Sequence, residues 1–405
     1  MFFLPGKAMA IMGPSSVLAV LTALSVAALL VFCFAELSSQ FDQTGGPILY
    51  ANATLGPVAA FGVGWLGYLS RVSSNAALVV IFATSATAAF PSLGGTESFL
   101  IVIFMLLLLA LNLCKVSFNA GVMDVVLVLK AIPLLIFIVW GAFHIETDNF
   151  MPFAPAGMGR LGETTLLIFY MIVGFEMMTV VAGETRDPER NIPRALFTVM
   201  LTSGALLLAL FIVLVGVYPQ AALSENPVAD AALAIMGPAG RMIAIGILLS
   251  VIGVNLSCSL ATPRYLYTMS RDGYLPRLFA RVSSTGRVPH VAVLVSFAIT
   301  YGLTIGNGYV YLVVLAAIAR IGQYMMSCVA LLILRYRRPP EEIRYRAPAG
   351  QLMAITALAV CGWLLFSAQR EHLLWSLLAL SIGYVLFFAN RALNRSDADE
   401  VEPSS

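Results

Sequence analysis

Residues 163–183 read ETTLLIFYMIVGFEMMTVVAG, an apolar stretch interrupted near its middle by a glycine and a carboxylate. Its length suits a membrane-spanning helix, which needs about 20 mainly apolar residues. Glu176 lies where hydrocarbon penalises an ionised side chain, and Gly174 stands two residues before it. A helix broken at this glycine needs partners for its freed amide groups, and a nearby carboxylate supplies one. We therefore expect a broken helix, with a structural and a functional role of Glu176 both open.

The whole chain is as apolar as this stretch. Of its 405 residues, 60% are hydrophobic and 11% are charged, and the mean hydropathy is +0.91. Soluble domains carry about 25% charged residues. The apolar residues suffice for at most about twelve spans of about 20 residues each. A soluble enzyme, a disordered chain and a disulfide scaffold are excluded, and a net charge of +2 gives no sign of nucleic acid as a partner.

Eleven full apolar spans can be marked between clusters of glycine, proline and charged residues. They cover residues 15–35, 57–89, 98–114, 120–143, 163–183, 195–217, 240–268, 289–305, 309–334, 349–367 and 372–392. A shorter apolar piece, residues 2–12, precedes them and is about half a span long. The sequence predicts an all-α membrane protein with eleven full spans and a partial first helix.

The basic residues divide unevenly between the two sets of loops. Alternate loops and the tail hold Lys115, Arg186, Arg190, Arg194, Arg271, Arg277, Arg281, Arg287, Arg335, Arg337, Arg338, Arg344, Arg346, Arg391 and Arg395. The opposite side holds only Lys7, Arg160, Arg241 and Arg370. Because basic loops stay inside, the C-terminus is predicted to be cytoplasmic. We expect a multi-pass protein of a bacterial inner membrane.

This orientation makes the N-terminus unusual. It places residue 14 outside, so residues 2–12 would form the outer half of a helix whose inner half is absent. Two explanations are open. The piece lies at the outer interface, or the chain lacks its true beginning because of a misplaced start or a shortened sequence.

The sequence contains no pattern of catalytic or metal-binding residues. The cysteines lie in apolar runs without CxxC spacing, at Cys33, Cys114, Cys258, Cys328 and Cys361. The histidines are far apart in the chain, at His144, His290 and His372. Paired carboxylates and nucleophile motifs are also missing. We expect no enzyme activity, no metal and no cofactor.

Several motifs resemble those of the amino acid–polyamine–organocation (APC) transporter superfamily. AELSSQFDQTGGPILY (35–50) resembles the loop after its second helix, and Phe3-Leu4-Pro5-Gly6 looks like the outer half of its first. Gly174-Phe175-Glu176 with VVAGETRDPERNIPRA (180–195) resembles the sixth helix and its cytoplasmic exit. SRDGYLPRLFARV (270–282) resembles the loop after the eighth helix. The chain is identified as a member, an amino acid permease, over essentially its whole length.

The resemblance implies a LeuT-like five-plus-five inverted-repeat bundle with two accessory helices, in which helices one and six are broken around a midplane site. The first repeat would be residues 1–143, with helix one truncated, and the second 161–338. Residues 349–392 would be the accessory helices and 393–405 a polar cytoplasmic tail. The repeat rests on the resemblance alone, because the halves share no visible sequence similarity. In relatives a Gly-Ser-Gly break precedes the residues that match the start of this chain, so half of their carboxylate site is missing here.

The resemblance also implies a set of substrate-binding residues. Carbonyl groups of the broken sixth helix would receive the substrate ammonium, an aromatic side chain there would cover the substrate, and side chains of the third and eighth helices would line the pocket. The matching residues are Ile172, Val173, Gly174, Tyr170, Asn75 and Ser257, with Glu176 beside them. For Tyr170 a place in the membrane core remains open, and for Ser257 a hydrogen bond to its own helix.

Lys130 lies about ten residues inside the span 120–143. It matches a fifth-helix lysine that, in proton-coupled relatives, occupies the place of a sodium ion. An ammonium in a region of low dielectric constant gives up its proton more readily, which suits proton coupling. The alternative is that its long side chain reaches the membrane surface.

Together these features predict a secondary active transporter, symporter or antiporter, that moves amino acids or related amines by alternating access. Glu176 is the only carboxylate near the expected site, which favours neutral or apolar substrates over cationic ones. A non-transporting or regulatory member of the same fold is the alternative. Protons and the lipid bilayer are the other expected partners, and the oligomeric state is left open, a homodimer included.

Overall fold

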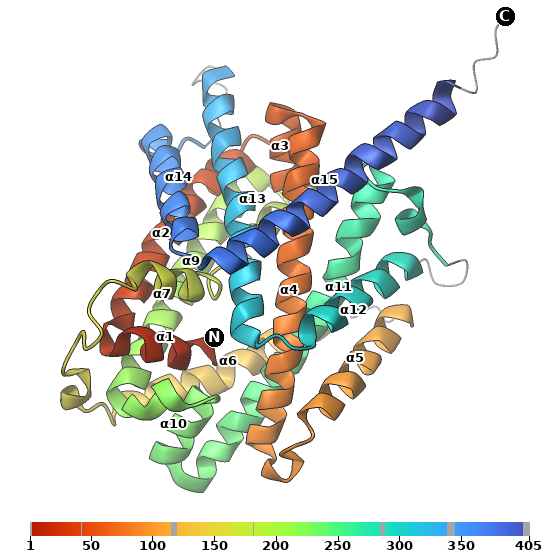
Figure 1. Cartoon of the computed structure of the whole chain (residues 1–405). Coiled ribbons are helices and arrows are strands. Elements are labelled where there is room, and N and C mark those ends of the chain that lie inside the picture. The colour runs from red at the N-terminus through yellow and green to blue at the C-terminus, as the bar shows by residue number, and fades with distance from the viewer. Residues whose placement is uncertain are drawn as a thin grey trace, which may run out of the picture.

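The computed structural model describes residues 2–41, 43–114, 120–180, 182–283, 288–337 and 345–399, with the side chains of 120–130 and 394–399 excepted. Within these ranges the regular structure is helical and no strand occurs, which confirms the prediction of an all-α protein (Figure 1). The α-helices are α1 Leu4–Met12, α2 Ser16–Ser38, α3 Pro47–Leu55, α4 Pro57–Ala89, α5 Glu97–Leu113, α6 Ala120–Ala142, α7 Leu161–Phe169, α8 Met177–Val180, α9 Pro188–Val217, α10 Pro227–Met236, α11 Gly240–Arg271, α12 His290–Thr304, α13 Tyr309–Arg337, α14 Gly350–Phe366 and α15 Arg370–Asp399.

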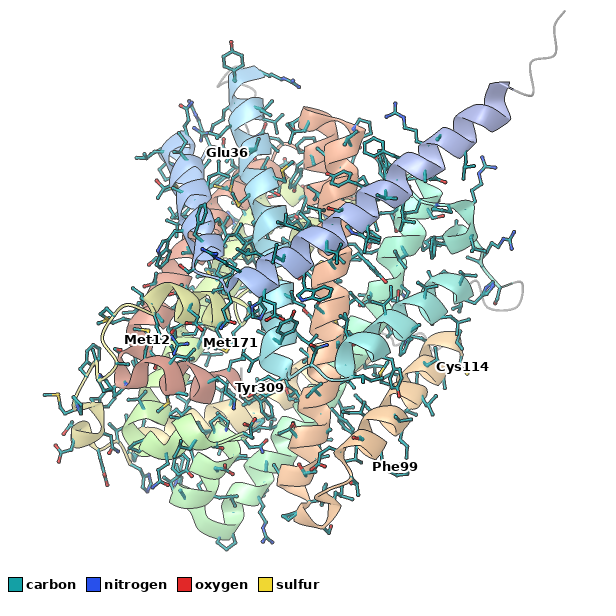
Figure 2. All side chains as sticks on the ribbon, viewed as in Figure 1. Met12, Glu36, Phe99, Cys114, Met171 and Tyr309 are labelled. Carbon is teal, nitrogen blue, oxygen red and sulfur yellow. The ribbon has the colours of Figure 1, made fainter. Side chains whose placement is uncertain are left out.

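Several helices are suited to a lipid environment. Six segments of the described chain are long and apolar enough to cross a membrane: Leu4–Ser38, Pro57–Ala89, Pro188–Val217, Pro227–Arg271, Tyr309–Arg337 and Arg370–Leu393. Four shorter helices are apolar too: Glu97–Leu113, Ala131–Ala142, His290–Thr304 and Gly350–Phe366. Large apolar side chains remain exposed on the outer helices, such as Phe99 of α5 (Figure 2) and Leu374 and Trp375 of α15. Surfaces of this kind belong in lipid, so the chain is an integral membrane protein.

The predicted spans coincide with helices, but one span is interrupted and two short helices were not predicted. Residues 57–89 form α4 with unchanged bounds, whereas the span 163–183 is divided between α7 and α8. The helices α3 and α10 lie between predicted spans. Both are short and begin at a proline, after Gly46 and Asn226 respectively. A proline in the first turn was their only clear signal, because they are too short to show as spans.

The N-terminal helix α1 is packed into the bundle. It packs against α7 and the turn Pro219–Leu223 (Figure 1). Phe3, Leu4 and Met12 are buried in the hydrophobic core. The apolar side chains of α1 are therefore covered by neighbouring helices.

The centre of the bundle is α4, which packs most extensively against α13 and α11 (Figure 1). Close approach of α4 to α11 depends on Gly67. A Cβ atom there would lie 2.8 Å from Cε1 of Tyr265, which is closer than real Cβ contacts. The glycine thus allows the Tyr265 ring to lie directly against the backbone of α4.

Glu36, near one end of the bundle (Figure 2), forms a buried ion pair that joins three segments. Arg335 of α13 donates from Nε and Nη2 to the two carboxylate oxygens of Glu36 on α2, each at 2.6 Å. The backbone N–H of Ala347, just before α14, donates to the same carboxylate at 2.9 Å. Glu36 therefore holds α2, α13 and the start of α14 together.

Candidate functional site

The predicted break in the span 163–183 is present. Helix α7 ends at Phe169 and α8 begins at Met177, and the seven residues between them form turns. Gly174 has φ +113°, a backbone conformation that L side chains rarely adopt. The sequence can leave the helix here because glycine accepts this conformation without steric cost.

The break leaves backbone carbonyl groups without their helical partners. Across the described chain, no hydrogen bond is directed at the carbonyl oxygens of Tyr170, Met171, Ile172 or Val173. Groups of this kind are tolerated at membrane depth only where they line a cavity or meet a ligand. The break therefore offers a row of acceptors to a hydrogen-bond donor such as an ammonium group.

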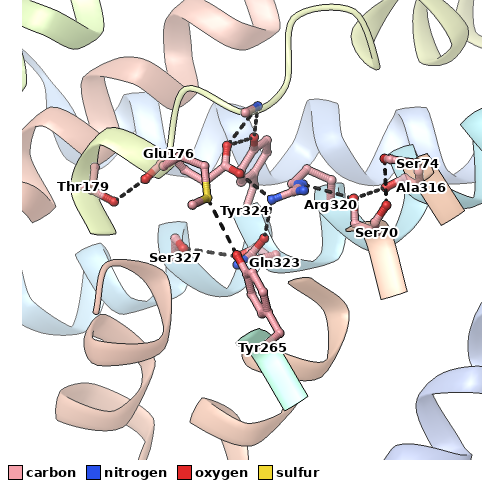
Figure 3. Close-up of polar contacts among 12 residues, drawn as sticks. Ser70, Ser74, Glu176, Thr179, Tyr265, Ala316, Arg320, Gln323, Tyr324 and Ser327 are labelled. Atoms are coloured by element: carbon pink, nitrogen blue, oxygen red, sulfur yellow. Dashed lines mark hydrogen bonds and ion pairs between the residues drawn. The ribbon is translucent and has the colours of Figure 1, made fainter. Parts of the chain in front are cut away.

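Glu176 satisfies the donors on the other side of the break. Its Oε2 accepts a hydrogen bond from the N–H of Gly174 at 3.0 Å, and a second from the hydroxyl of Tyr324 (Figure 3). Its Oε1 forms an ion pair with Nη1 of Arg320. The Glu176 side chain is only 1% exposed, so its charge depends on these partners.

Arg320 carries this network from the break into α4. Its Nε donates to Oγ of Ser70 at 3.1 Å, and its Nη1 also donates to Oε1 of Gln323 at 3.3 Å (Figure 3). The break, α13 and α4 are thereby linked through one guanidinium group. The structural role expected for Glu176 is thus present, and the carboxylate has little remaining capacity to accept further hydrogen bonds.

A cavity of about 670 Å³ lies beside the break. Its walls come from α1, α4, α6, α9, α11, α13 and the turns after α7. The residues that line it are Phe2, Phe3, Leu4, Arg71, Ser74, Leu78, Ile81, Ala131, Leu134, Tyr170, Met171, Val173, Gly174, Val199, Thr202, Ser203, Leu206, Ser250, Val251, Val254, Ser257, Cys258 and Arg320. The wall is mainly apolar, with a few polar groups, as in sites for small molecules.

The cavity unites some of the predicted binding residues. Tyr170, Val173 and Gly174, from the turns after α7, line it together with Ser257 of α11, which is far away in the sequence. The hydroxyl of Ser257 also donates to the carbonyl of Gly253 at 3.0 Å. The hydrogen bond to its own helix, expected as the alternative for this serine, is therefore present together with a place in the wall.

Other predicted residues lie elsewhere. Glu176 and Ile172 belong to the break but not to the cavity wall. Asn75 is buried in α4 outside the wall, and its Oδ1 has no hydrogen-bond partner among the described residues. Lys130 belongs to α6, but its side chain lies outside the described residues, and the next residue, Ala131, lines the cavity. Their binding and coupling roles stay predictions.

Two cavity residues, Arg71 and Arg320, were not among the predicted site residues. They are the only charged side chains that line the cavity in the described part of the chain, and both are cationic. Both lie inside predicted spans, and an ionisable residue within a span is a candidate functional residue by default. That signal was sufficient to find them, although it did not reveal which of the two is neutralised.

Comparison with known proteins agrees with this arrangement. A family model described as amino acid permease matches residues 1–388. The chain is 25% identical to the methylthioribose transporter of Bacillus subtilis, over 93% of this chain and 86% of the relative. It is 26% identical to the branched-chain amino acid permease BcaP of the same organism, over 96% and 88%. It is also 30% identical to the chloroplastic cationic amino acid transporter 9 of Arabidopsis thaliana, over 67% of this chain and 52% of the relative.

Proposed function

The chain belongs to the amino acid permease family, and from this premise we propose that it is a secondary active transporter that carries amino acids across the membrane by alternating access. The family consists of transporters and not enzymes, in agreement with the lack of catalytic motifs. The relatives with known substrates are named for methylthioribose, branched-chain amino acids and cationic amino acids, so the family alone does not decide the substrate.

The observation that carries the proposal is the broken helix at the wall of the cavity. The free carbonyl groups of Tyr170, Met171 and Val173, three residues of the cavity wall, can accept hydrogen bonds from a substrate ammonium, because an ammonium carries three donors and no acceptor. Tyr170 would cover the bound substrate from the same segment, and Ser257 would complete the opposite wall. In this scheme Glu176 keeps the break in shape, and Asn75 contributes only in another conformation.

The transport cycle would follow the inverted-repeat arrangement. In this proposal residues 1–143 and 161–338 are the two repeats, residues 349–392 are accessory, and the C-terminus is cytoplasmic in a bacterial inner membrane. Transport then requires the site to face each side in turn, by movement of one bundle of helices against the other. The packing of α1 and of the α7–α8 segment against one cavity supports this scheme, because both halves then contribute to the site.

Proton coupling is the second part of the proposal. The fifth-helix residue Lys130 would exchange a proton as the cavity opens to each side in turn, because its ammonium is less stable in a region of low dielectric constant. The cavity wall includes Ala131 and Leu134 of the same helix, which supports a place for Lys130 near the site. A symporter and an antiporter remain equally compatible with this role.

Reconstitution tests the transport function. Purified protein in liposomes, given mixtures of radiolabelled amino acids, should accumulate label above the level of protein-free liposomes. An inward proton gradient should increase the accumulation. Absence of uptake despite ligand-dependent thermal stabilisation would contradict transport and support the non-transporting alternative.

The coupling role is tested by Lys130→Ala in the same liposomes. The variant should lose accumulation driven by the pH gradient while it retains exchange of labelled for unlabelled substrate. Lys7→Ala is the matched control, because Lys7 forms only a partly exposed ion pair with Glu225. Unchanged pH dependence in Lys130→Ala would show that this residue does not couple protons.

A further inference from the structure

Arg71 places a permanent positive charge in the cavity wall. It lies in the middle of α4, and its side chain is half-buried. A guanidinium group does not lose its proton in proteins, so the charge is present at every physiological pH. Whatever occupies the cavity therefore meets a fixed cation.

The positive charge of Arg71 has no anionic partner in the described part of the chain. No hydrogen bond or ion pair leads from its guanidinium to another described residue, and its buried Nε has no partner. Arg320, the other cation of the wall, differs because Glu176 neutralises it and Ser70 accepts a hydrogen bond from it. The pair of Arg320 and Glu176 sums to zero, so among the described side chains of the wall Arg71 is the one that contributes a net charge.

The side chain of Arg71 is held in a defined position. Its Cζ lies 5.4 Å from the ring centroid of Tyr265, a cation–π contact. The Tyr265 hydroxyl donates in turn to Sδ of Met177 at 3.7 Å, and this methionine is the first residue of α8 (Figure 3). Gly67 allows the ring to approach α4 so closely. The guanidinium is thus oriented by contacts that connect it to the helix break, yet none of them supplies a negative charge.

An unpaired charge at membrane depth is unfavourable, and intramembrane arginines normally pair with an anion or face a water-filled cavity. The described lining of this cavity contains no Asp or Glu. Guanidinium binds a carboxylate through two parallel charge-assisted hydrogen bonds, which are roughly twice as strong as neutral ones. A ligand carboxylate would therefore complete the site.

We propose that Arg71 is the carboxylate-binding residue of the cavity, and that it selects amino acids with neutral or acidic side chains against those with cationic side chains. This inference rests on the proposed transport function and names the substrate class of that site. The substrate ammonium lies at the free carbonyl groups of the break, and the carboxylate lies at Arg71 in the same cavity. A cationic side chain would add a further positive charge to a cavity whose described wall already has a net positive charge.

Competition for binding to the wild-type protein tests the inference without any variant. Leucine and glutamate should displace a bound radiolabelled neutral amino acid, whereas isoamylamine, which is leucine without its carboxylate, should not. Lysine and arginine should compete at least about tenfold more weakly than leucine, since each charge-assisted contact changes affinity on that scale. Equal competition by lysine or by isoamylamine would overturn the proposal.

The variant Arg71→Gln should lower the affinity for the carboxylate substrate by about 10- to 100-fold, the range for loss of a charged hydrogen-bond pair. Arg71→Lys should retain part of it, because the charge remains without the two-pronged geometry. Arg264→Gln is the matched control, since Arg264 is an exposed intramembrane arginine of α11 outside the cavity wall. If Arg71→Gln loses leucine binding, Arg71 binds the α-carboxylate of the substrate. If Arg71→Gln loses glutamate binding but keeps leucine binding, Arg71 binds the side-chain carboxylate.

The two proposals fail in different ways. Wild-type uptake that Arg71→Gln leaves unchanged in affinity and in selectivity would overturn the role of Arg71 and leave the transport function intact. Absence of uptake and of binding in the wild type would reject the transport function itself. Size-exclusion profiles of the variants in detergent show whether they fold, and if they do not, the wild-type competition still decides for or against the carboxylate role.

Discussion

Replacement of Glu176 by glutamine removes the negative charge from the most deeply buried ion pair at the helix break. The side chains of Glu176 and Arg320 are 1% and 5% exposed, so water cannot replace the lost partner. Glutamine has the same shape but only one acceptor oxygen. That oxygen can face either Arg320, or Gly174 and Tyr324, whereas the carboxylate serves all three donors. The amide NH₂ group then faces the remaining donor or donors, either Arg320 or Gly174 and Tyr324, and cannot accept a hydrogen bond from them.

The size of the effect follows from this burial. Removal of one partner from a buried ion pair costs about 3–5 kcal/mol, because the remaining charge stays in a medium of low dielectric constant. The double variant Glu176→Gln with Arg320→Gln removes both charges. Its cost should therefore be about 0–2 kcal/mol, since replacing a whole buried pair by neutral groups is often close to neutral. The expected coupling between the two positions is thus several kcal/mol and favourable.

The free energy of unfolding of each variant can be measured by titration with SDS in mixed micelles. The uptake assay then shows whether the stability restored in the double variant also restores transport. Glu225→Gln serves as a control for removal of an exposed carboxylate. Two results would refute the reasoning. One is a free energy of unfolding of Glu176→Gln that is lower than that of the wild type by less than about 1 kcal/mol. The other is a loss of stability in the double variant that equals the sum of the losses in the two single variants, because the loss of both charges of a buried pair should cost less than that sum.

Two further predictions concern the backbone at the break and the second buried ion pair. Gly174→Ala should lower the free energy of unfolding by about 1–3 kcal/mol and reduce uptake, because an alanine at φ +113° is strained. A Cβ atom at this position meets nothing within 4 Å, so crowding would not be the cause. Gly302→Ala in α12, also without crowding, should leave the stability unchanged or raise it by up to about 1 kcal/mol, and equal losses in both variants would exclude backbone strain as the cause. Glu36→Gln should lower the free energy of unfolding by about 3–5 kcal/mol, because it leaves Arg335 buried without its anionic partner. Glu225→Gln, at a more exposed ion pair, should lower it by less than about 1 kcal/mol. Equal losses in chemical denaturation would contradict the role of burial.

Much of the architecture could be predicted from local sequence features. Apolar runs bounded by proline, glycine and charge predicted the positions of the long helices, such as α4 at residues 57–89. Gly174 followed by Glu176 predicted the break, because the backbone freedom of the glycine and the acceptor for its N–H lie within three residues of each other. The short helices α3 and α10 were not predicted, since neither is long enough to produce a recognisable apolar run.

The candidate site was only partly predictable. Tyr170, Val173, Gly174 and Ser257 were expected on the strength of motif resemblance, and the structure brings them to one cavity. The position of Arg71 inside an apolar span marked it as a candidate, but its role could not be predicted, because that role depends on the absence of an anionic partner among the described residues. Its sequence neighbours do not show that Arg320 has a carboxylate partner while Arg71 faces a cavity without one.

The sequence by itself determined that this protein is a bundle of membrane helices broken at Gly174, because hydropathy and backbone conformation are properties of neighbouring residues. Only the tertiary structure decided that Glu176 pairs with Arg320, 144 positions away in the chain, and that Arg71 lines the cavity without an anionic partner among the described residues. The physical reason is that a buried charge is stabilised by whatever lies within a few ångströms of it. Those neighbours come from different helices, and only their packing brings them together.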